Sequence, residues 1–296
     1  MRFLNPSPAM SATILTLSVV IGAVAGCSPS SVSTGGSQPL RSAPARAFNE
    51  ADPATWTLPM EGYLPSDDER SQVAKAKNLL IGDCMKKAGY GQWRPAPELP
   101  KMGPKTLTDW RYGIHDGELA KRRGYKPDEA EQAAYDAAVN VGAVDGTSAE
   151  GPDGKALQVC IGEARTKLGG NQATYGEEAQ KLGNEAFSRS KENSKVVAAF
   201  QAWSSCMKEQ GYDYKQPLDA SDDQRFGGKE VTSEEIATAT ADISCRNRTH
   251  VAKIWWEAEV ELQTASLEKN AETLEKARKD LDASVKAVAE VLSGEK

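Results

Sequence analysis

The chain has 296 residues and a formal net charge of −6, with 36 Lys and Arg residues against 42 Asp and Glu residues. A chain of this length can bury a substantial hydrophobic core. Acidic and basic residues are interspersed rather than gathered in blocks, and no basic patch marks a nucleic-acid partner.

The N-terminal segment has the features of an export signal. The apolar run over residues 14–25 is too short to span a bilayer and is typical of the hydrophobic region of a signal peptide. Residues 24–27 read Val-Ala-Gly-Cys, which resembles the bacterial lipobox, in which the cysteine is lipidated and becomes the first mature residue. We therefore expect a lipoprotein signal peptide over residues 1–26 and a lipid on Cys27, which places the protein at the outer face of the bacterial cytoplasmic membrane. The alternative is an ordinary signal peptide with a chance cysteine.

The segment after the lipobox predicts a tether. Residues 27–50 are rich in Ser, Pro and Gly and show no apolar periodicity, which is typical of a flexible linker. About 20 such residues have an r.m.s. reach on the order of 25 Å. This reach is enough to lift a folded domain off a membrane.

One string, Cys-Met-Lys-x-x-Gly-Tyr, occurs twice, at residues 84–90 and 206–212. Apolar residues at helical spacing precede each copy, which predicts two amphipathic helices. Gly89 and Gly211 are placed to take the left-handed conformation that ends such helices, with the following tyrosine packing back on the last turn. A proline five residues after each tyrosine prevents the helix from resuming.

The cysteines predict two disulfides. Once Cys27 is set aside, four cysteines remain, and they allow three pairings. Because each copy of the string is followed by one more cysteine, the repeat favours the pairs Cys84 with Cys160 and Cys206 with Cys245. A metal site or a reactive thiol is the less favoured alternative, since no Cys-x-x-Cys occurs and each cysteine stands on an apolar stripe. We expect two related helical units, over residues 51–170 and 171–296, each stapled by its own disulfide.

Capping signals and apolar periodicity place the helices. Ser66 followed by Glu69 is a capping box, and it predicts a first helix that ends at Gly89. Further helices are predicted over residues 116–123, 127–141, 155–168 and 175–210.

The C-terminal part of the chain predicts one long helix. Thr232 followed by Glu235 is a second capping box, and no Pro or Gly occurs from there to residue 293. Apolar residues recur every seven positions, at Val260, Leu267, Leu274, Leu281 and Val288. The predicted fold class is therefore all-α, with this long helix in a bundle or antiparallel coiled coil, folded back on the helix that ends at Gly211.

Residues with catalytic potential are few. The chain has two histidines, His115 and His250. No nucleophile motif accompanies His115, which we interpret as a loop residue that bonds locally, and His250 as a packing or surface residue. His-Glu-x-x-His is absent, so we expect neither a metal nor a cofactor. Carboxylates are too numerous for any pair to be informative, which leaves a glycan hydrolase that uses two of them open.

The pair Trp255-Trp256 is the most unusual aromatic feature. Neighbouring side chains on a helix point about 100° apart, so one narrow seam cannot bury both. One interpretation is an exposed partner-binding surface. The other is a helix segment that the rest of the protein contacts on two sides.

Several short strings resemble a family of uncharacterised exported lipoproteins of actinobacteria. Besides the lipobox and the repeated cysteine string, they are Arg111-Tyr112-Gly113, Gly124-Tyr125 and Ala241-Asp242-x-x-Cys245. The resemblance implies location and architecture, and it implies no activity. We therefore expect a lipid-anchored cell-surface binding or adaptor protein without catalytic activity, whose partner is an envelope protein or the cell wall. The alternative is a cell-envelope enzyme such as a carboxylate-dependent wall hydrolase.

Overall fold

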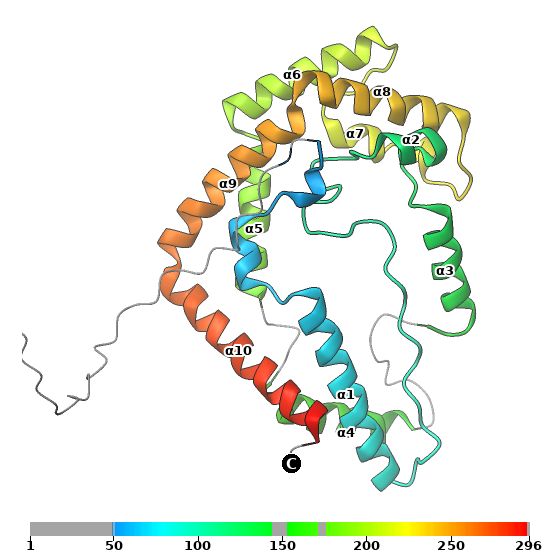
Figure 1. Ribbon diagram of the computed structural model, residues 1–296, viewed down its shortest axis with the longest axis vertical. Helices are drawn as coiled ribbons and strands as arrows, with labels where there is room; N and C mark the ends of the chain where they lie inside the picture. The colour runs from blue at the N-terminus through cyan, green and yellow to red at the C-terminus, as the bar shows by residue number, and fades with distance from the viewer. Residues whose placement is uncertain (1–48, 50, 144–152, 171–175, 295–296) are drawn as a thin grey trace, which may run out of the picture. The chain divides into compact units, whose positions relative to one another are not determined.

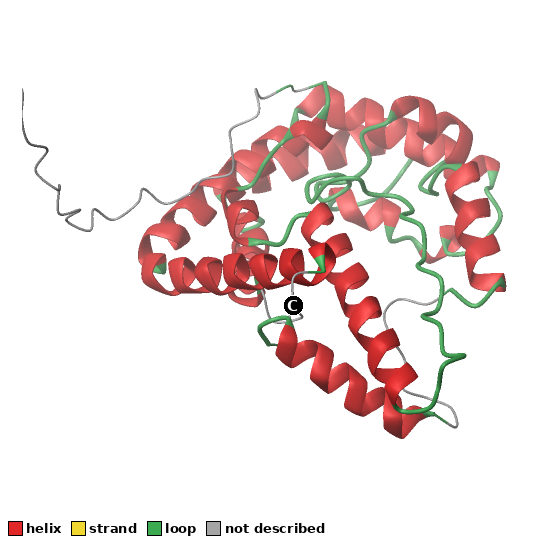
Figure 2. Ribbon diagram, turned by 60° about the horizontal axis from the view of Figure 1, so that its bottom comes forward, coloured by secondary structure: helices red, strands yellow, loops and turns green. Residues whose placement is uncertain are grey.

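The computed structural model describes residue 49 and residues 51–143, 153–170 and 176–294. These residues belong to one compact unit that is entirely helical, and no strand occurs among them (Figures 1 and 2). The all-α prediction is therefore confirmed. The predicted signal peptide, the lipidation site at Cys27 and nearly all of the tether lie outside the described residues. No helix in the described ranges is long and apolar enough to cross a membrane.

The helices differ in length, and the longest connection between α-helices runs from α1 to α2. The α-helices are α1 (Asp67–Lys87), α2 (Gly117–Arg123), α3 (Glu129–Asn140), α4 (Gly154–Lys167), α5 (Glu177–Ser190), α6 (Ser194–Glu209), α7 (Pro217–Ser221), α8 (Ser233–Thr249), α9 (Val251–Lys269) and α10 (Ala271–Ser293). The short 3₁₀ helices within the described residues are η1 (Pro53–Thr55), η2 (Pro59–Tyr63) and η4 (Gln224–Phe226). η1 and η2 precede α1, and η4 lies between α7 and α8.

The two copies of the repeated string end their helices in the same way. Gly89 has a φ of 93° and Gly211 a φ of 91°, the left-handed values expected at these positions. The amide of Tyr90 donates to the carbonyl of Met85 (2.8 Å), and the amide of Tyr212 donates to the carbonyl of Met207 (2.9 Å). These are the bonds of a Schellman cap, so the predicted ends of α1 and α6 are confirmed.

The disulfides link the helices that the repeat predicts. Cys84 joins α1 to Cys160 of α4 with a Cα–Cα distance of 5.5 Å, and Cys206 joins α6 to Cys245 of α8 at 5.6 Å. The second bridge is buried on both sides. In the first bridge Cys160 is buried, whereas Cys84 is only half-buried.

The predicted continuous helix over residues 232–293 is divided. The chain leaves the helical conformation at His250, which has a φ of 51°, and at Asn270, with a φ of −113°. The long C-terminal helix that remains is α10. The predicted helix over residues 175–210 is likewise divided, into α5 and α6, and the side chain of Asn193 caps α6. Each break lets two shorter helices turn their apolar faces toward the same core, which one straight rod cannot do.

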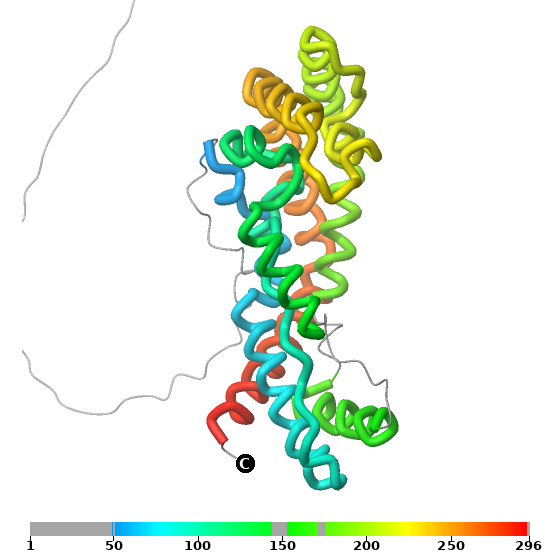
Figure 3. The backbone as a smooth tube through the Cα atoms, turned by 90° about the vertical axis from the view of Figure 1, so that its right-hand side faces the viewer, coloured from blue at the N-terminus to red at the C-terminus, as the bar shows by residue number. Residues whose placement is uncertain are grey.

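The packing around α10 differs from the predicted pairing. α6 packs against α8 and α9, as the fold-back over the 213–231 loop requires, but α10 packs against α1 (Figure 3). Leu274 of α10 is fully buried, next to residues of η2 and α5. The predicted apolar stripe is therefore buried in the core, but the part of it on α10 does not pack against α6.

Helices from both predicted units contact each other. α2 packs against α8, and α1 packs against α10, so contacts cross the predicted boundary at residue 170. The α2–α8 contact brings the segment that follows residue 104 onto the C-terminal helices. This segment forms one wall of the candidate site.

Candidate functional site

The loop over residues 108–115 is fixed to α9 by one buried carboxylate. Glu259 is fully buried and accepts hydrogen bonds from Arg111 Nη2 (2.7 Å) and Tyr112 Oη (2.7 Å). Gln263, one turn further along α9, donates to the same carboxylate (2.7 Å). Burial alone would lower the pKa of Arg111, but the hydrogen bonds with Glu259 hold that pKa above its usual value. Burial and Glu259 raise the pKa of Tyr112 well above its usual value, so its hydroxyl remains a donor.

A second buried pair fixes the same loop to α8. Asp242 is fully buried and accepts from three donors, namely Arg246 Nε (2.7 Å), Trp203 Nε1 (2.8 Å) and Tyr125 Oη (3.3 Å). Burial raises the pKa of the Asp242 carboxyl, and the neighbouring Arg246 opposes that effect. The Arg246 guanidinium also donates to the carbonyls of Tyr112 and Pro217. One arginine therefore connects the loop, α7 and α8.

Two glycines of the loop region are required by close approach. Gly113 has a φ of +104°, and a Cβ at this position would lie 2.1 Å from Cζ of Arg246. Gly124 has a φ of +60°, and its Cβ would lie 2.5 Å from Cγ of Glu235. Glu235 is fully buried and accepts from the amide of Tyr125 (3.1 Å) instead of returning to the α8 cap. The predicted capping box at Thr232 therefore keeps only its first half, in which Thr232 Oγ1 accepts from the amide of residue 235.

The strings Arg-Tyr-Gly, Gly-Tyr and Ala-Asp-x-x-Cys thus meet in space. Their polar side chains and glycines hold residues 108–126 against α8 and α9 through contacts that span more than a hundred residues of sequence. The sequence singled out these strings without indicating that they meet.

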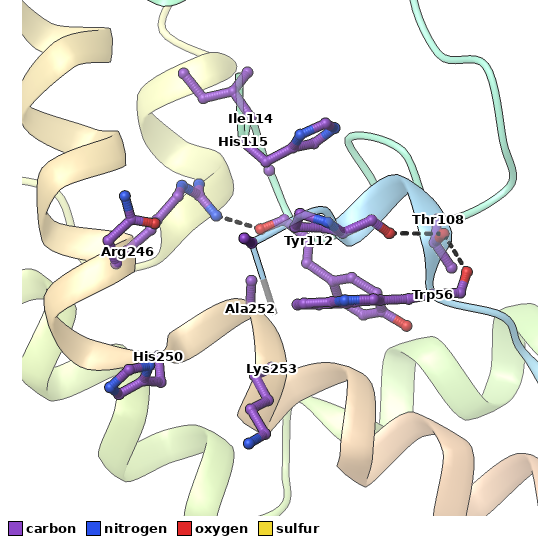
Figure 4. A pocket seen from close by; sticks show the side chains of 13 residues that line it. Trp56, Thr108, Tyr112, Ile114, His115, Arg246, His250, Ala252 and Lys253 are labelled. Atoms are coloured by element: carbon purple, nitrogen blue, oxygen red, sulfur yellow. Dashed lines mark hydrogen bonds between the residues drawn. The ribbon is translucent and has the colours of Figure 1, made fainter. Parts of the chain in front are cut away.

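A cavity of about 440 Å³ lies between this loop and the corner where α8 meets α9 (Figure 4). Its size is within the range of sites for small molecules. Its lining consists of Ala51, Pro53, Trp56, Thr108, Tyr112, Gly113, Ile114, His115, Arg246, Asn247, His250, Ala252 and Lys253. In Figure 4, His115 lies on one side of the loop backbone, and His250 and Lys253 lie on the other side, at the start of α9.

Both histidines of the chain line this cavity. His115 Nε2 pairs with Asp109 Oδ1, which confirms the predicted local bond. His250 occupies the exposed left-handed corner between α8 and α9, in agreement with the surface interpretation. The sequence did not predict that they share a cavity, because the corner at residue 250 carries no helix-breaking residue.

The structure corrects the interpretation of Trp255 and Trp256 as an exposed partner surface. Trp255 is 1% exposed, and its Nε1 donates to Ser190 Oγ (2.7 Å). Trp256 is half-buried, packs against Trp56 with the ring centroids 5.6 Å apart and the ring planes tilted by 47°, and donates to the carbonyl of Thr57 (3.2 Å). The two side chains pack on different neighbours, so the helix is contacted on two sides.

A second cavity, of about 890 Å³, lies between α1, α4 and α10. Leu79 and Val159 at its edge are 49% and 60% exposed. The charged residues that line it are of both signs, namely Asp83, Lys87, Glu163, Lys167 and Glu290. The bridge between α1 and α4 forms part of its wall.

Within the described ranges, no group of three or more His, Cys, Asp or Glu side chains is arranged to hold a metal ion. Comparisons with protein-family models, curated proteins and solved structures give no match to this chain. The geometry of the two cavities is therefore the basis for a functional proposal.

Proposed function

We propose that this protein is a lipid-anchored, non-catalytic binding protein at the outer face of the bacterial cytoplasmic membrane, and that the 440 Å³ cavity binds a small molecule of the envelope. The observation that carries the proposal is that the cavity is already formed. Its loop wall is held by the buried carboxylates Glu259 and Asp242. A wall that is rigid before binding reduces the conformational entropy lost when a ligand is bound.

The anchor rests on the lipobox and the tether. Two or more acyl chains give stable membrane attachment, where a single chain gives only reversible binding. Cys27→Ser is expected to move the protein from the membrane fraction to the medium or to leave the precursor unprocessed. An unmodified Cys27 thiol in the mature wild-type protein, detected by mass spectrometry, would contradict this part of the proposal.

The lining of the cavity favours binding over hydrolysis. It offers hydrogen-bond donors on His115, Asn247, His250 and Lys253. None of the thirteen described residues that line it is Asp or Glu, whereas glycoside hydrolysis uses two carboxylates that flank the reacting bond. These groups recognise a ligand but do not supply an acid and base pair for a wall hydrolase.

The binding site is tested by filling it. Ala252 lines the cavity from the first turn of α9, so Ala252→Phe places a ring in the space that a ligand would occupy. The matched control is Ala287→Phe, the same change in the larger cavity. Native mass spectrometry of protein extracted from the producing cells is expected to show a small molecule on the wild type and on the control, but not on Ala252→Phe. Equal ligand occupancy in all three proteins would refute the assignment of the site.

In the alternative function, a wall hydrolase, the catalytic carboxylates would lie in the larger cavity. Asp83, Glu163 and Glu290 line that cavity from three different helices. Purified peptidoglycan is the substrate to test. Turnover by the wild type that Glu163→Gln abolishes, with the melting temperature unchanged, would favour the alternative. No turnover by the wild type is the result expected of a binding protein.

A further inference from the structure

We infer that the 440 Å³ cavity is selective for a small organic anion with an apolar body. The inference rests on the proposed function and specifies the ligand class for the same site. It is carried by the charge of the lining, by the absence of acidic side chains from the thirteen described lining residues, and by the size and polarity of the walls.

Every ionisable side chain of the described lining, apart from the Tyr112 phenol, is basic. These residues are His115, Arg246, His250 and Lys253. The chain as a whole has more acidic than basic residues, and the larger cavity carries charges of both signs. Basic lining in an acidic protein is therefore a local feature of this cavity. It gives complementarity to a negative ligand.

Two acidic groups are paired with basic residues of the lining. Asp109 pairs with His115, and its side chain is 9% exposed. Asp242 is fully buried and pairs with Arg246. Both carboxylates therefore orient basic groups and line no part of the cavity.

Donors remain for a ligand after these pairs are made. A guanidinium has five N–H donors. In Arg246, three hydrogen bonds go to the Asp242 carboxylate and to the carbonyls of Tyr112 and Pro217. Lys253 has an ammonium group with three N–H donors on a flexible side chain. An ammonium group with three donors can keep an internal contact and still bind an anion.

The remaining walls set the size and nature of the rest of the ligand. At about 30 Å³ per water-sized group, 440 Å³ holds roughly fifteen such groups. Pro53, Ile114 and Ala252 contribute apolar surface, and the rings of Trp56 and Tyr112 also line the cavity. A planar or branched apolar body with one charged end fits this combination.

The test compares probes of one shape and different charge. Naphthalene carboxylate and naphthyl phosphate are the charged probes, and naphthalene carboxamide is the neutral one. Isothermal titration calorimetry of the full mature chain is expected to show that a charged probe binds about tenfold or more tightly than the carboxamide. Raising the salt concentration should weaken binding of the charged probes and leave the carboxamide unaffected. The preferred headgroup, carboxylate or phosphate, identifies which anion the site takes.

Three variants locate the effect. Lys253→Met is expected to weaken binding of the charged probes by about fivefold or more and to leave the affinity for the carboxamide unchanged. Lys87→Met, in the larger cavity, should change neither affinity. Ala252→Phe should abolish all binding. If the carboxamide binds as tightly as the charged probes and Ala252→Phe removes both, the anion inference is overturned, and the proposed binding function stands. If no probe binds, the inference is overturned as well, and the native mass spectra decide the proposed function separately.

Discussion

Replacing Gly113 by alanine tests how the loop is built. A Cβ at this position would lie 2.1 Å from Cζ and Nη1 of Arg246 and 2.2 Å from Nη2. The guanidinium cannot rotate away freely, because its Nε is bonded to the fully buried Asp242 and its Nη2 to the carbonyl of Pro217. The substitution must therefore displace a buried, bonded charge or move the loop.

The expected cost has two parts. The left-handed φ of +104° costs a non-glycine residue about 1–2 kcal/mol. Displacing the guanidinium loses at least one charge-assisted hydrogen bond, worth about 1.5–3 kcal/mol. Gly113→Ala should therefore lower the free energy of unfolding by roughly 3–5 kcal/mol. At about 2–4 °C per kcal/mol for a domain of this size, the melting temperature should fall by roughly 6–20 °C.

Gly211 provides a matched control. Its φ of +91° is close to that of Gly113, but nothing lies within 4 Å of the position of its Cβ. Gly211→Ala should therefore cost only the backbone strain of about 1–2 kcal/mol. Urea denaturation of both variants with the disulfides intact measures the difference. Equal free energies of unfolding for the two variants would show that the contact between residue 113 and Arg246 does not affect stability, and would refute this prediction.

Three further outcomes are expected. Under native conditions a dithiol should reduce the bridge between α1 and α4 before the buried bridge between α6 and α8, and alkylation followed by peptide mapping would reveal the opposite order. Glu259→Gln should destabilise by about 3–5 kcal/mol because it leaves the charge of Arg111 without its buried partner; a melting temperature equal to that of the wild type would contradict this. A hydrogen bond from Arg225 holds the pKa of Asp223 well below its usual value, so its stabilisation is present above about pH 4 and is lost as the pH falls through the folded-state pKa. The difference in free energy of unfolding between the wild type and Asp223→Asn should therefore become smaller in strong acid. A difference that stays constant from neutral pH to about pH 2 would refute the lowered pKa of Asp223.

The helix ends could be predicted because their signals are local. Ser66 caps α1 through the amide of Glu69, and Gly89 and Gly211 close α1 and α6, each within a few residues of its partner atoms. The disulfide pairing followed from the order of the repeat along the chain. The break at His250 was not predictable in this way. Residues other than glycine rarely adopt a left-handed φ, and His250 does so where Val251 and Trp255 of the next turn become buried.

The candidate site could not be predicted because its contacts are distant in sequence. Arg111 meets Glu259 across 148 positions, and Tyr125 meets Asp242 across 117. Charged residues at such separations are indistinguishable in a single sequence from the many charges on solvated helix faces. A partial indication of the two closely packed glycines was present in the sequence, because they belong to the recognisable strings Arg-Tyr-Gly and Gly-Tyr. Only the structure shows that a guanidinium and a carboxylate side chain fill the space that a Cβ would need.

Tyr112, Gly113 and Arg246 both fix the loop and line the cavity, whereas Arg111 and Glu259 fix the loop without lining the cavity. Glu259 is fully buried, Arg111 is partly buried, and both are bonded on several sides, so their replacement is expected to disturb the fold. His250 is exposed and Lys253 is half-buried at the corner between α8 and α9. A substitution of Lys253 is expected to change stability by only about 0.5 kcal/mol, whereas a residue that replaces His250 must also adopt the left-handed φ of 51°. A fixed scaffold with a replaceable lining lets the ligand change while the fold is kept. Under the proposed function, specificity at this site should therefore follow the side chains at positions 250 and 253, because Arg246 is held by its pair with Asp242.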